Sequence, residues 1–348
     1  MTDSVELIDA LDRRVARRDE RREFFKAAFG MGAFAVGGAA ALSFSTKASA
    51  QTTTITDADI LNFALNLEYL EAQFYLYAAT GAGLPSNLLS GTGTPGAVIT
   101  GTGANMARAV DFTGEPAIAA YAREIAADEV AHVTFLRSAG ALGSSAVAQP
   151  AINISGALDG PFTAAARAAG VIPAGNTTTP FDPYSSPDNF LLGSYIFEDV
   201  GVTAYKGASP LITNKTFLQA AAGILAVEAY HAAIVRTTLY ARGMGSIATA
   251  NSAAVAAKPS LLTAADQISN ARDSLDGATR DLDQGISPTT VSNALVSNIV
   301  PLDSNGIAFS RTPSQVLNIV YLNAAAATMG GFFPNGLNGN LRASVAAS

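Results

Sequence analysis

The chain has 348 residues, enough to bury a sizeable core; 49% of them are hydrophobic and only 14% are charged. That balance suits well-packed helices and argues against a disordered or coiled-coil chain. The net charge is −7 and there is no basic cluster, which disfavours nucleic-acid binding. The absence of cysteine excludes disulfides, thiolate nucleophiles and iron–sulfur ligation.

Residues 1–50 predict an export signal. A charged run containing Arg21, Arg22 and Lys26 precedes a Gly/Ala-rich apolar stretch, and the small residues 48–50 close the segment. This order resembles a bacterial twin-arginine signal. The alternative is an N-terminal membrane anchor, but the apolar stretch is short and rich in glycine for a spanning helix. We therefore expect cleavage after Ala50, a periplasmic location and no stable membrane anchor afterwards.

Residues 51–243 are predicted to form one domain with four long helices. The first follows the cap Thr56 and stops at 80–81, and the second runs from about 113 to 138. The third runs from 187 to before Gly207, and the fourth from 213 or 214 to about 243. A long irregular connection is expected over 141–186. A hairpin, a crossover and a second hairpin together predict an all-α four-helix bundle.

Residues 244–348 are predicted to be a C-terminal extension packed on this bundle. One helix is expected over 261–275, and another from Pro313, capped by Thr312, to about Thr328. The segment 330–336, Gly-Gly-Phe-Phe-Pro-Asn-Gly, is aromatic and rich in turn residues. We expect it to pack against the bundle, and we expect no separate functional site in the extension.

The two histidines of the chain carry the chemical signal. Each lies three residues after a glutamate, in the pairs Glu129–His132 and Glu228–His231. On a helix this spacing places both side chains on one face, one turn apart, so both can reach the same metal ion. Only seven glutamates follow residue 50, so the chance of two such pairs is on the order of one in a thousand.

The other two long helices repeat a different pattern. Glu68 precedes Tyr75 by seven residues, and Glu198 precedes Tyr205 by the same interval. Seven residues are close to two turns, and the intervening positions on each stripe are mostly apolar, so both glutamates face the core. Both tyrosines are interpreted as amphipathic core residues, with a redox role as the alternative.

A carboxylate in a bundle core is costly unless it is paired or ligates a metal. Four of them, one per helix, would repel one another without cations between them, and two divalent ions supply the matching positive charge. Two single glutamates and two Glu-x-x-His pairs form the ligand set of di-iron and di-manganese carboxylate bundles. The predicted metal ligands are Glu68, Glu129, His132, Glu198, Glu228 and His231.

With these residues, segment 56–243 resembles the ferritin-like superfamily, whose ligand pattern the six residues match one by one. Within it, stretches 61–71, 197–205 and 330–336 are similar to the desiccation-related proteins of plants and bacteria. That family is known more for its association with stress than for a demonstrated reaction. The resemblance therefore implies the fold, a ferritin-like bundle with a long crossover, more than the function.

Three acidic neighbours of the ligands have open roles. Glu71 lies one turn beyond Glu68 and could ligate or bridge, although a position just outside the metal ligands is favoured. Asp128 and Asp199 adjoin ligands, and each could orient a histidine or face solvent, with neither alternative preferred.

The leading hypothesis is an exported oxidoreductase with two Fe or Mn ions that handles dioxygen, peroxide or ferrous iron, in ferroxidase-like or catalase-like form. The alternative is a non-enzymatic desiccation or stress protein in which the metal is structural or sequestered. A vestigial, empty site is disfavoured because all six ligands are retained. Metal ions and small oxidants are the expected partners. The sequence leaves open the metal, the existence of turnover and whether the chain forms a homo-oligomer.

Overall fold

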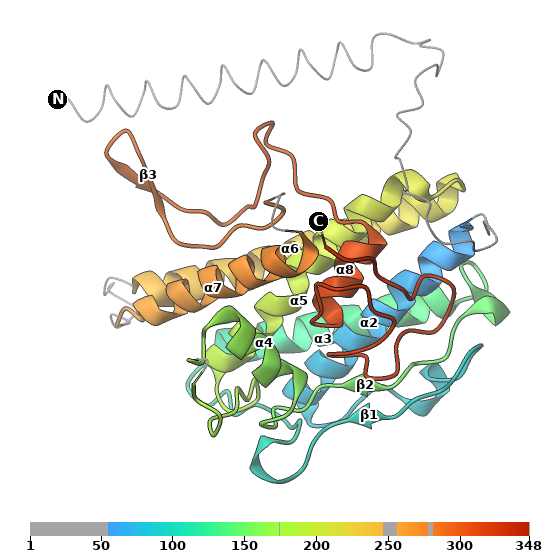
Figure 1. Ribbon diagram of the computed structural model, residues 1–348, viewed down its shortest axis with the longest axis horizontal. Coiled ribbons are helices and arrows are strands. Elements are labelled where there is room, and N and C mark those ends of the chain that lie inside the picture. The colour runs from blue at the N-terminus through green and yellow to red at the C-terminus, as the bar shows by residue number, and fades with distance from the viewer. Residues whose placement is uncertain (1–54, 174, 246–255, 278–280, 348) are drawn as a thin grey trace. The chain divides into compact units, whose positions relative to one another are not determined.

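A computed structural model describes residues 55–173, 175–245, 256–277 and 281–347. The predicted export signal lies outside these residues. In the described part, four long helices form two hairpins, α2 (Asp57–Thr80) with α3 (Pro116–Arg137) and α5 (Pro187–Ala208) with α6 (Lys215–Met244). The hairpins meet through α2 against α5 and α3 against α6, and this four-helix core confirms the predicted all-α, ferritin-like fold (Figure 1).

Local chemistry explains where these helices begin and end. The Thr56 hydroxyl accepts the Asp59 backbone N–H, and Asp59 reaches back to the Thr56 N–H, a reciprocal cap. Gly81 ends α2 in the left-handed conformation, at φ 78°. Ser186 caps α5 and Asn214 caps α6. The helix starts predicted from the sequence therefore agree with the structure to within about three residues.

Helix α2 is the central element of the bundle, since every residue from 60 to 75 is buried. Several buried polar side chains of α2 form hydrogen bonds with the connection after α3 and with the C-terminal tail. Asn62 bonds to Ser145 and Val147, Asn66 to Asn338, and Gln73 to Gln149. A helix buried on all sides needs such partners for its polar groups.

The connections flanking α3 pair with each other. Strand β1 (Val98–Ile99) runs parallel to β2 (Ile152–Asn153), with Val98 opposite Ile152. Short 3₁₀ turns occur along the connections: Ser86–Leu88, Gly103–Asn105, Gly143–Ser145 and Ser209–Leu211. The crossover also contains a helix that the sequence reading missed, α4 (Pro161–Ala169). Gly160 supplies no side-chain cap, so burial of Phe162 and Ala166 stabilises this short helix instead.

The C-terminal region packs on the bundle. Helix α7 (Pro259–Asp276) contacts α5 and α6, and α8 (Pro313–Val320) contacts α5 and α7. Strands β3 (Thr289–Val291) and β4 (Ala294–Val296) form an exposed antiparallel hairpin. The Phe332 and Phe333 side chains are fully buried, and the Phe332 ring lies against Phe162 and Phe197.

Two predicted helix ends were wrong. Helix α5 continues through Gly207, whose missing side chain instead admits the Arg311 carbonyl; a Cβ there would lie 2.0 Å from that oxygen. Helix α8 ends at Val320 and not near residue 328, because Leu322 turns left-handed at φ 54°. The tail then returns, and the Phe332 N–H donates to the Val320 carbonyl.

Helix α6 is long and apolar enough to cross a membrane by length and composition alone, a property that core helices of soluble proteins share. In this fold its Glu228, His231 and Arg236 side chains are buried among the other helices.

Candidate metal centre

The bundle brings the six predicted ligands together at its centre. Glu68 comes from α2 and Glu198 from α5, while α3 and α6 each supply one Glu-x-x-His pair. All six residues are buried, the most accessible being His132 at 8%. The two hairpins thus contribute equivalent sets, one glutamate from the first helix and a Glu–His pair from the second.

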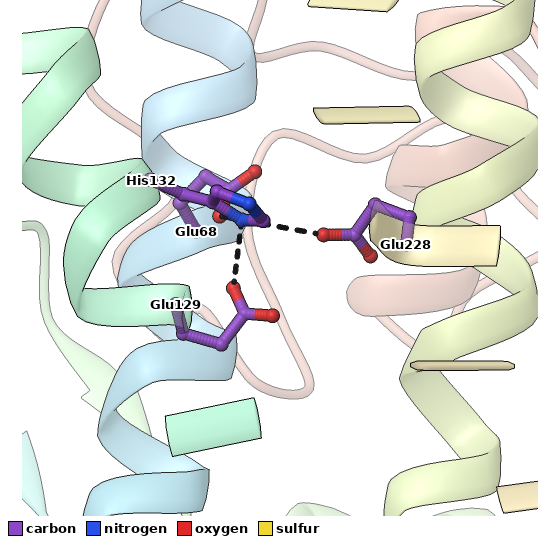
Figure 2. A group of neighbouring side chains, drawn as sticks. All are labelled: Glu68, Glu129, His132 and Glu228. Atoms are coloured by element: carbon purple, nitrogen blue, oxygen red, sulfur yellow. Dashed lines mark hydrogen bonds and ion pairs between the residues drawn. The ribbon is translucent and has the colours of Figure 1, made fainter. Parts of the chain in front are cut away.

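Each imidazole directs Nδ1 toward carboxylates of both hairpins, as Figure 2 shows for His132. His132 Nδ1 lies 3.1 Å from Glu68 Oε2, 3.6 Å from Glu129 Oε2 and 3.5 Å from Glu228 Oε1. His231 Nδ1 lies 3.1 Å from Glu129 Oε1 and 3.8 Å from Glu198 Oε2. The ring centroids are 6.3 Å apart, and Glu129 lies close to both rings.

Donor atoms of these residues form two groups within which all lie 4.8 Å or less apart. One contains Glu68, Glu129, His132 and Glu228, and the other Glu198, Glu228 and His231. Because Glu228 belongs to both groups and Glu129 contacts both histidines, these two carboxylates occupy the shared positions. Glu68 and Glu198 lie at the two ends.

The two tyrosines bond across the bundle. The Tyr75 hydroxyl on α2 donates to Glu198 Oε1 on α5, and the Tyr205 hydroxyl on α5 donates to Glu68 Oε1 on α2. The seven-residue spacing placed each tyrosine on the stripe of its own glutamate, but each serves the glutamate of the other hairpin. Each end carboxylate is therefore oriented by the opposite half of the fold.

Of the two aspartates that adjoin ligands, only Asp128 contacts a histidine. Asp128 Oδ2 lies 3.1 Å from His231 Nε2, although its side chain is 42% exposed. That contact directs Nδ1 of His231 inward and fixes its tautomer. Asp199 neither contacts a histidine nor faces solvent, because its Oδ2 pairs with Arg236 and Arg272, each at 2.8 Å.

The electrostatics of the cluster are those of a site built for cations. Burial and the nearby Glu129 raise the pKa of Glu68 to about 7, and burial raises the pKa of Glu198 to about 8. Burial alone would lower the histidine values, but neighbouring carboxylates raise the pKa of His132 to about 10 and of His231 to about 9. Excess negative charge therefore draws positive charge into the core.

Several of these buried atoms also lack hydrogen-bond partners. Among the described residues these include both oxygens of Glu129 and of Glu228, Glu198 Oε2 and His231 Nδ1. Buried polar atoms are normally satisfied, so unpaired oxygen and nitrogen atoms converging on one point fit a metal centre. The cluster thus fits metal binding, while the assignment of individual ligands stays a prediction.

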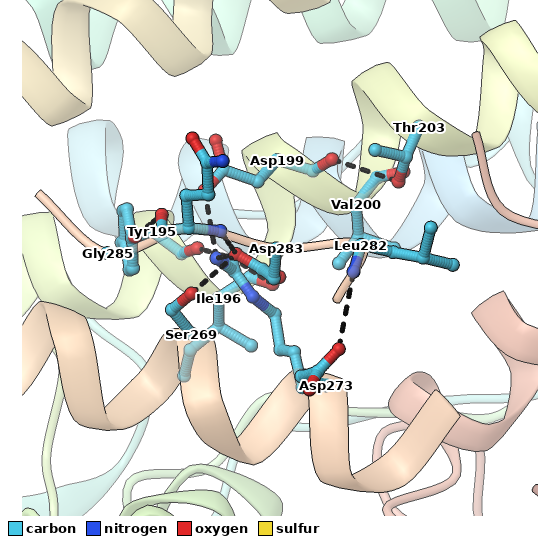
Figure 3. A network of polar contacts seen from close by, with 12 residues as sticks. Tyr195, Ile196, Asp199, Val200, Thr203, Ser269, Asp273, Leu282, Asp283 and Gly285 are labelled. Atoms are coloured by element: carbon cyan, nitrogen blue, oxygen red, sulfur yellow. Dashed lines mark hydrogen bonds and ion pairs between the residues drawn. The ribbon is translucent and has the colours of Figure 1, made fainter. Parts of the chain in front are cut away.

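A second buried polar cluster, which sequence reasoning missed, is formed around Asp199 and Asp283 (Figure 3). Asp199 and Asp283 pair with guanidinium groups of the buried residues Arg236, Arg272 and Arg311. These ion pairs join α5, α6 and α7 to the C-terminal chain. Asp199, which takes part in them, directly follows Glu198 in the sequence. One sequence feature could have indicated this cluster: an arginine inside an apolar stretch, as at Arg236 in α6, is seldom buried without an acidic partner.

Comparison with known proteins agrees with this arrangement. The model of the family described as "Ferritin-like domain" matches residues 56–241. A desiccation-related protein of Craterostigma plantagineum is 30% identical over 295 residues, covering 82% of this chain and 83% of that protein. A protein of Nesocodon mauritianus named ferritin-like catalase is 28% identical over 288 residues, covering 82% and 84%. No solved structure matches the chain.

Proposed function

Because this chain belongs to the ferritin-like domain family, we propose that its buried carboxylate–histidine cluster holds two Fe or Mn ions and handles peroxide, dioxygen or ferrous iron in stress protection. The observation that carries the proposal is the convergence of buried carboxylate and imidazole groups from all four helices, with unpaired oxygen or nitrogen atoms on α3, α5 and α6. A relative named ferritin-like catalase favours chemistry with peroxide.

In this proposal each residue has a stated task. Glu129 and Glu228 would hold both ions from the shared positions, while Glu68 and Glu198 would each hold one ion and are oriented by Tyr205 and Tyr75 respectively. His132 and His231 complete the two halves of the site, and Asp128 holds His231 in its orientation. A bound pair of redox-active ions supplies electron exchange and open positions for a small oxidant.

The test is elemental analysis of purified native protein beside a Glu129→Ala/Glu228→Ala double variant. We expect about two equivalents of Fe or Mn in the native protein and none in the variant. Glu124→Ala is the matched control, since Glu124 is exposed on the same helix as Glu129. Absence of a transition metal from native protein would overturn the proposal.

The second candidate is a non-enzymatic desiccation protein whose metal is structural or sequestered. The similarity to a desiccation-related protein over most of the chain favours it. Turnover separates the two. Peroxide- or dioxygen-dependent oxidation by the metal-loaded native protein, lost in the double variant, supports the enzyme, whereas bound metal without turnover supports the second candidate.

We also propose export to the periplasm through residues 1–50. The paired Arg21-Arg22 and the small residues before Gln51 support it. Fractionation of cells expressing the native chain and an Arg21→Lys/Arg22→Lys variant tests this. Native protein shortened by the signal should be periplasmic and the variant should stay unprocessed; equal processing of both would contradict the twin-arginine route.

A further inference from the structure

The two hairpins carry equivalent sets of predicted ligands, but they differ at one position next to these ligands. Three residues after its glutamate, α2 carries a second carboxylate, Glu71, whereas α5 carries Gly201. A Cβ at position 201 would lie 2.4 Å from Glu228 Oε2 and 3.5 Å from Glu71 Oε1. The glycine of one hairpin therefore makes room for an additional carboxylate from the other, next to the shared ligand Glu228.

Glu71 stands apart from the ligand cluster. It belongs to neither group of converging donor atoms, it is only 6% exposed, and it has no hydrogen-bond partner among the described residues. A buried carboxyl group without a partner destabilises a fold, so its presence calls for a ligand that it contacts. The position favoured for Glu71 from the sequence, just outside the metal ligands, stays a prediction.

Glu71 lines a cavity of about 20 Å³, enough for one molecule not much larger than water. The walls come from α2, α5, α8 and the C-terminal tail and are apolar apart from Glu71 and the backbone at Gly201. The apolar lining residues are Leu67, Leu70, Ile196, Phe197, Val200, Ile319, Val320 and Phe332.

A second cavity, of about 30 Å³ and lined by apolar side chains apart from Arg272, lies next to the first. It shares Ile196 and Ile319 with the first cavity and extends between α4 and α7 to the exposed residue Ala168. Ala169 and Ala271 also line it. The two cavities are therefore neighbours, with Ile196 and Ile319 in the walls of both, and together they reach from the surface at α4 to the carboxyl group of Glu71.

The polarity of the cavity walls and the hydrogen-bonding capacity of Glu71 determine which small molecule fits there. These walls disfavour cations, including ferrous iron, because a cation loses its hydration among apolar side chains without gaining ligands, and the charged residue in the outer wall, Arg272, is itself positive. Dioxygen could enter but has no hydrogen to donate to Glu71. Hydrogen peroxide is small, uncharged and carries two O–H donors. We propose that this path admits hydrogen peroxide and that Glu71 binds it beside Glu228 by accepting one O–H.

This inference rests on the proposed function and names its substrate and a further substrate-binding residue. The first test compares native protein with Glu71→Leu and Glu71→Gln. We expect both variants to retain the metal content of native protein. Glu71→Leu should raise the KM for hydrogen peroxide roughly tenfold or more, with a smaller effect on kcat, since it removes the acceptor. Glu71→Gln should retain part of the affinity because its amide oxygen still accepts.

Thermal unfolding supplies a readout that does not depend on turnover. Replacing an unpartnered buried carboxyl by leucine should raise the Tm, whereas a residue kept for structure would lower it when replaced. Loss of metal in Glu71→Leu would make Glu71 a ligand and overturn the inference. A native KM in a fully metallated Glu71→Leu protein would overturn it as well.

The path has its own matched pair of variants on α4. Ala169→Phe fills the outer cavity, whereas Ala164→Phe places the same ring at an exposed position that does not line it. We expect Ala169→Phe to lower kcat/KM for hydrogen peroxide severalfold and Ala164→Phe to leave it unchanged. Equal values for the two variants would overturn the route. Native protein without Fe or Mn would instead refute the proposed function, so the two failures are distinguishable.

Discussion

At the scale of single residues, the centre depends on contacts that cross from one hairpin to the other. Tyr205 orients Glu68 and Tyr75 orients Glu198, so each end carboxylate accepts a hydrogen bond from a tyrosine of the other hairpin. A hydrogen bond to a ligand oxygen sets the direction of the lone pair that a metal would use. The two tyrosines therefore couple ligand geometry to the docking of the hairpins.

Tyr205→Phe removes one of these bonds and keeps the buried ring. We expect metal affinity to fall roughly 10- to 100-fold, because Glu68 loses the donor that orients it. Competition with a chelator of known affinity measures the change. Tyr230→Phe is the control, since Tyr230 is 71% exposed on α6. Equal affinities in the two variants would contradict the orienting role of Tyr205.

At the scale of elements, α5 is the helix on which the separate parts of the molecule meet. One face presents Glu198 to the centre, while Asp199 pairs with arginines of α6 and α7. Further along, Gly207 packs against the backbone of Arg311. Residues of α5 such as Asp199 and Gly207, whose contacts the helix sequence alone does not indicate, are therefore constrained by other helices and by the C-terminal chain.

The two helical glycines Gly207 and Gly223 should respond oppositely to alanine. At Gly207 a Cβ would collide with the Arg311 carbonyl, so we expect a loss of about 1–3 kcal/mol or more in unfolding free energy. At Gly223 a Cβ meets nothing within 4 Å, so the better helix former should add roughly 0.5–1 kcal/mol. Denaturant unfolding measures both. Shifts of the same sign would refute this packing of α5.

The buried ion-pair cluster gives a second prediction at this scale. Asp283 accepts from Arg272 at 2.6 Å and from Arg311 at 3.0 Å, and all three side chains are buried. Asp283→Ala would leave two guanidinium groups short of a partner, at an expected cost of about 3–5 kcal/mol in unfolding free energy. As a control, Lys258→Ala removes a partly exposed ion pair with Asp188 and should cost less than about 1 kcal/mol.

At the scale of the whole molecule, the fold concentrates negative charge in the bundle core. Five buried glutamates lie in or beside the centre: Glu68, Glu71, Glu129, Glu198 and Glu228. Among the described residues, only His132 and His231 contact the cluster with an opposite charge. Without metal, the core therefore keeps carboxylates that repel one another, and the pKa values of Glu71 and Glu228 are raised well above their usual range by burial and by the other glutamates.

Removal of metal by a chelator should consequently lower the Tm of native protein, because bound ions stabilise the folded state that holds the ligands. A Glu129→Gln/Glu228→Gln variant, with two fewer buried carboxylates and no metal, should unfold at the same temperature with and without chelator. Its Tm should exceed that of chelated native protein. Differential scanning calorimetry measures all four states, and a native Tm that is insensitive to complete metal removal would be the contrary result.

The sequence by itself determined the features that depend on local spacing. Helix starts follow from caps such as Thr56 and Asn214, and the Glu-x-x-His pairs follow from the helical period, since both rules act within a few residues. These rules are why the four-helix fold and the convergence of the six predicted ligands could be predicted.

Only the tertiary structure decided which residues meet across the bundle. The pairing of each tyrosine with the opposite glutamate, of Asp199 with arginines, and of Glu71 with Gly201 joins residues far apart in sequence. The end of α8 and the short α4 were missed for the same reason, because packing of the tail and of Phe162 overrides local preference there. No spacing rule reports such contacts, since they exist only once the helices have docked.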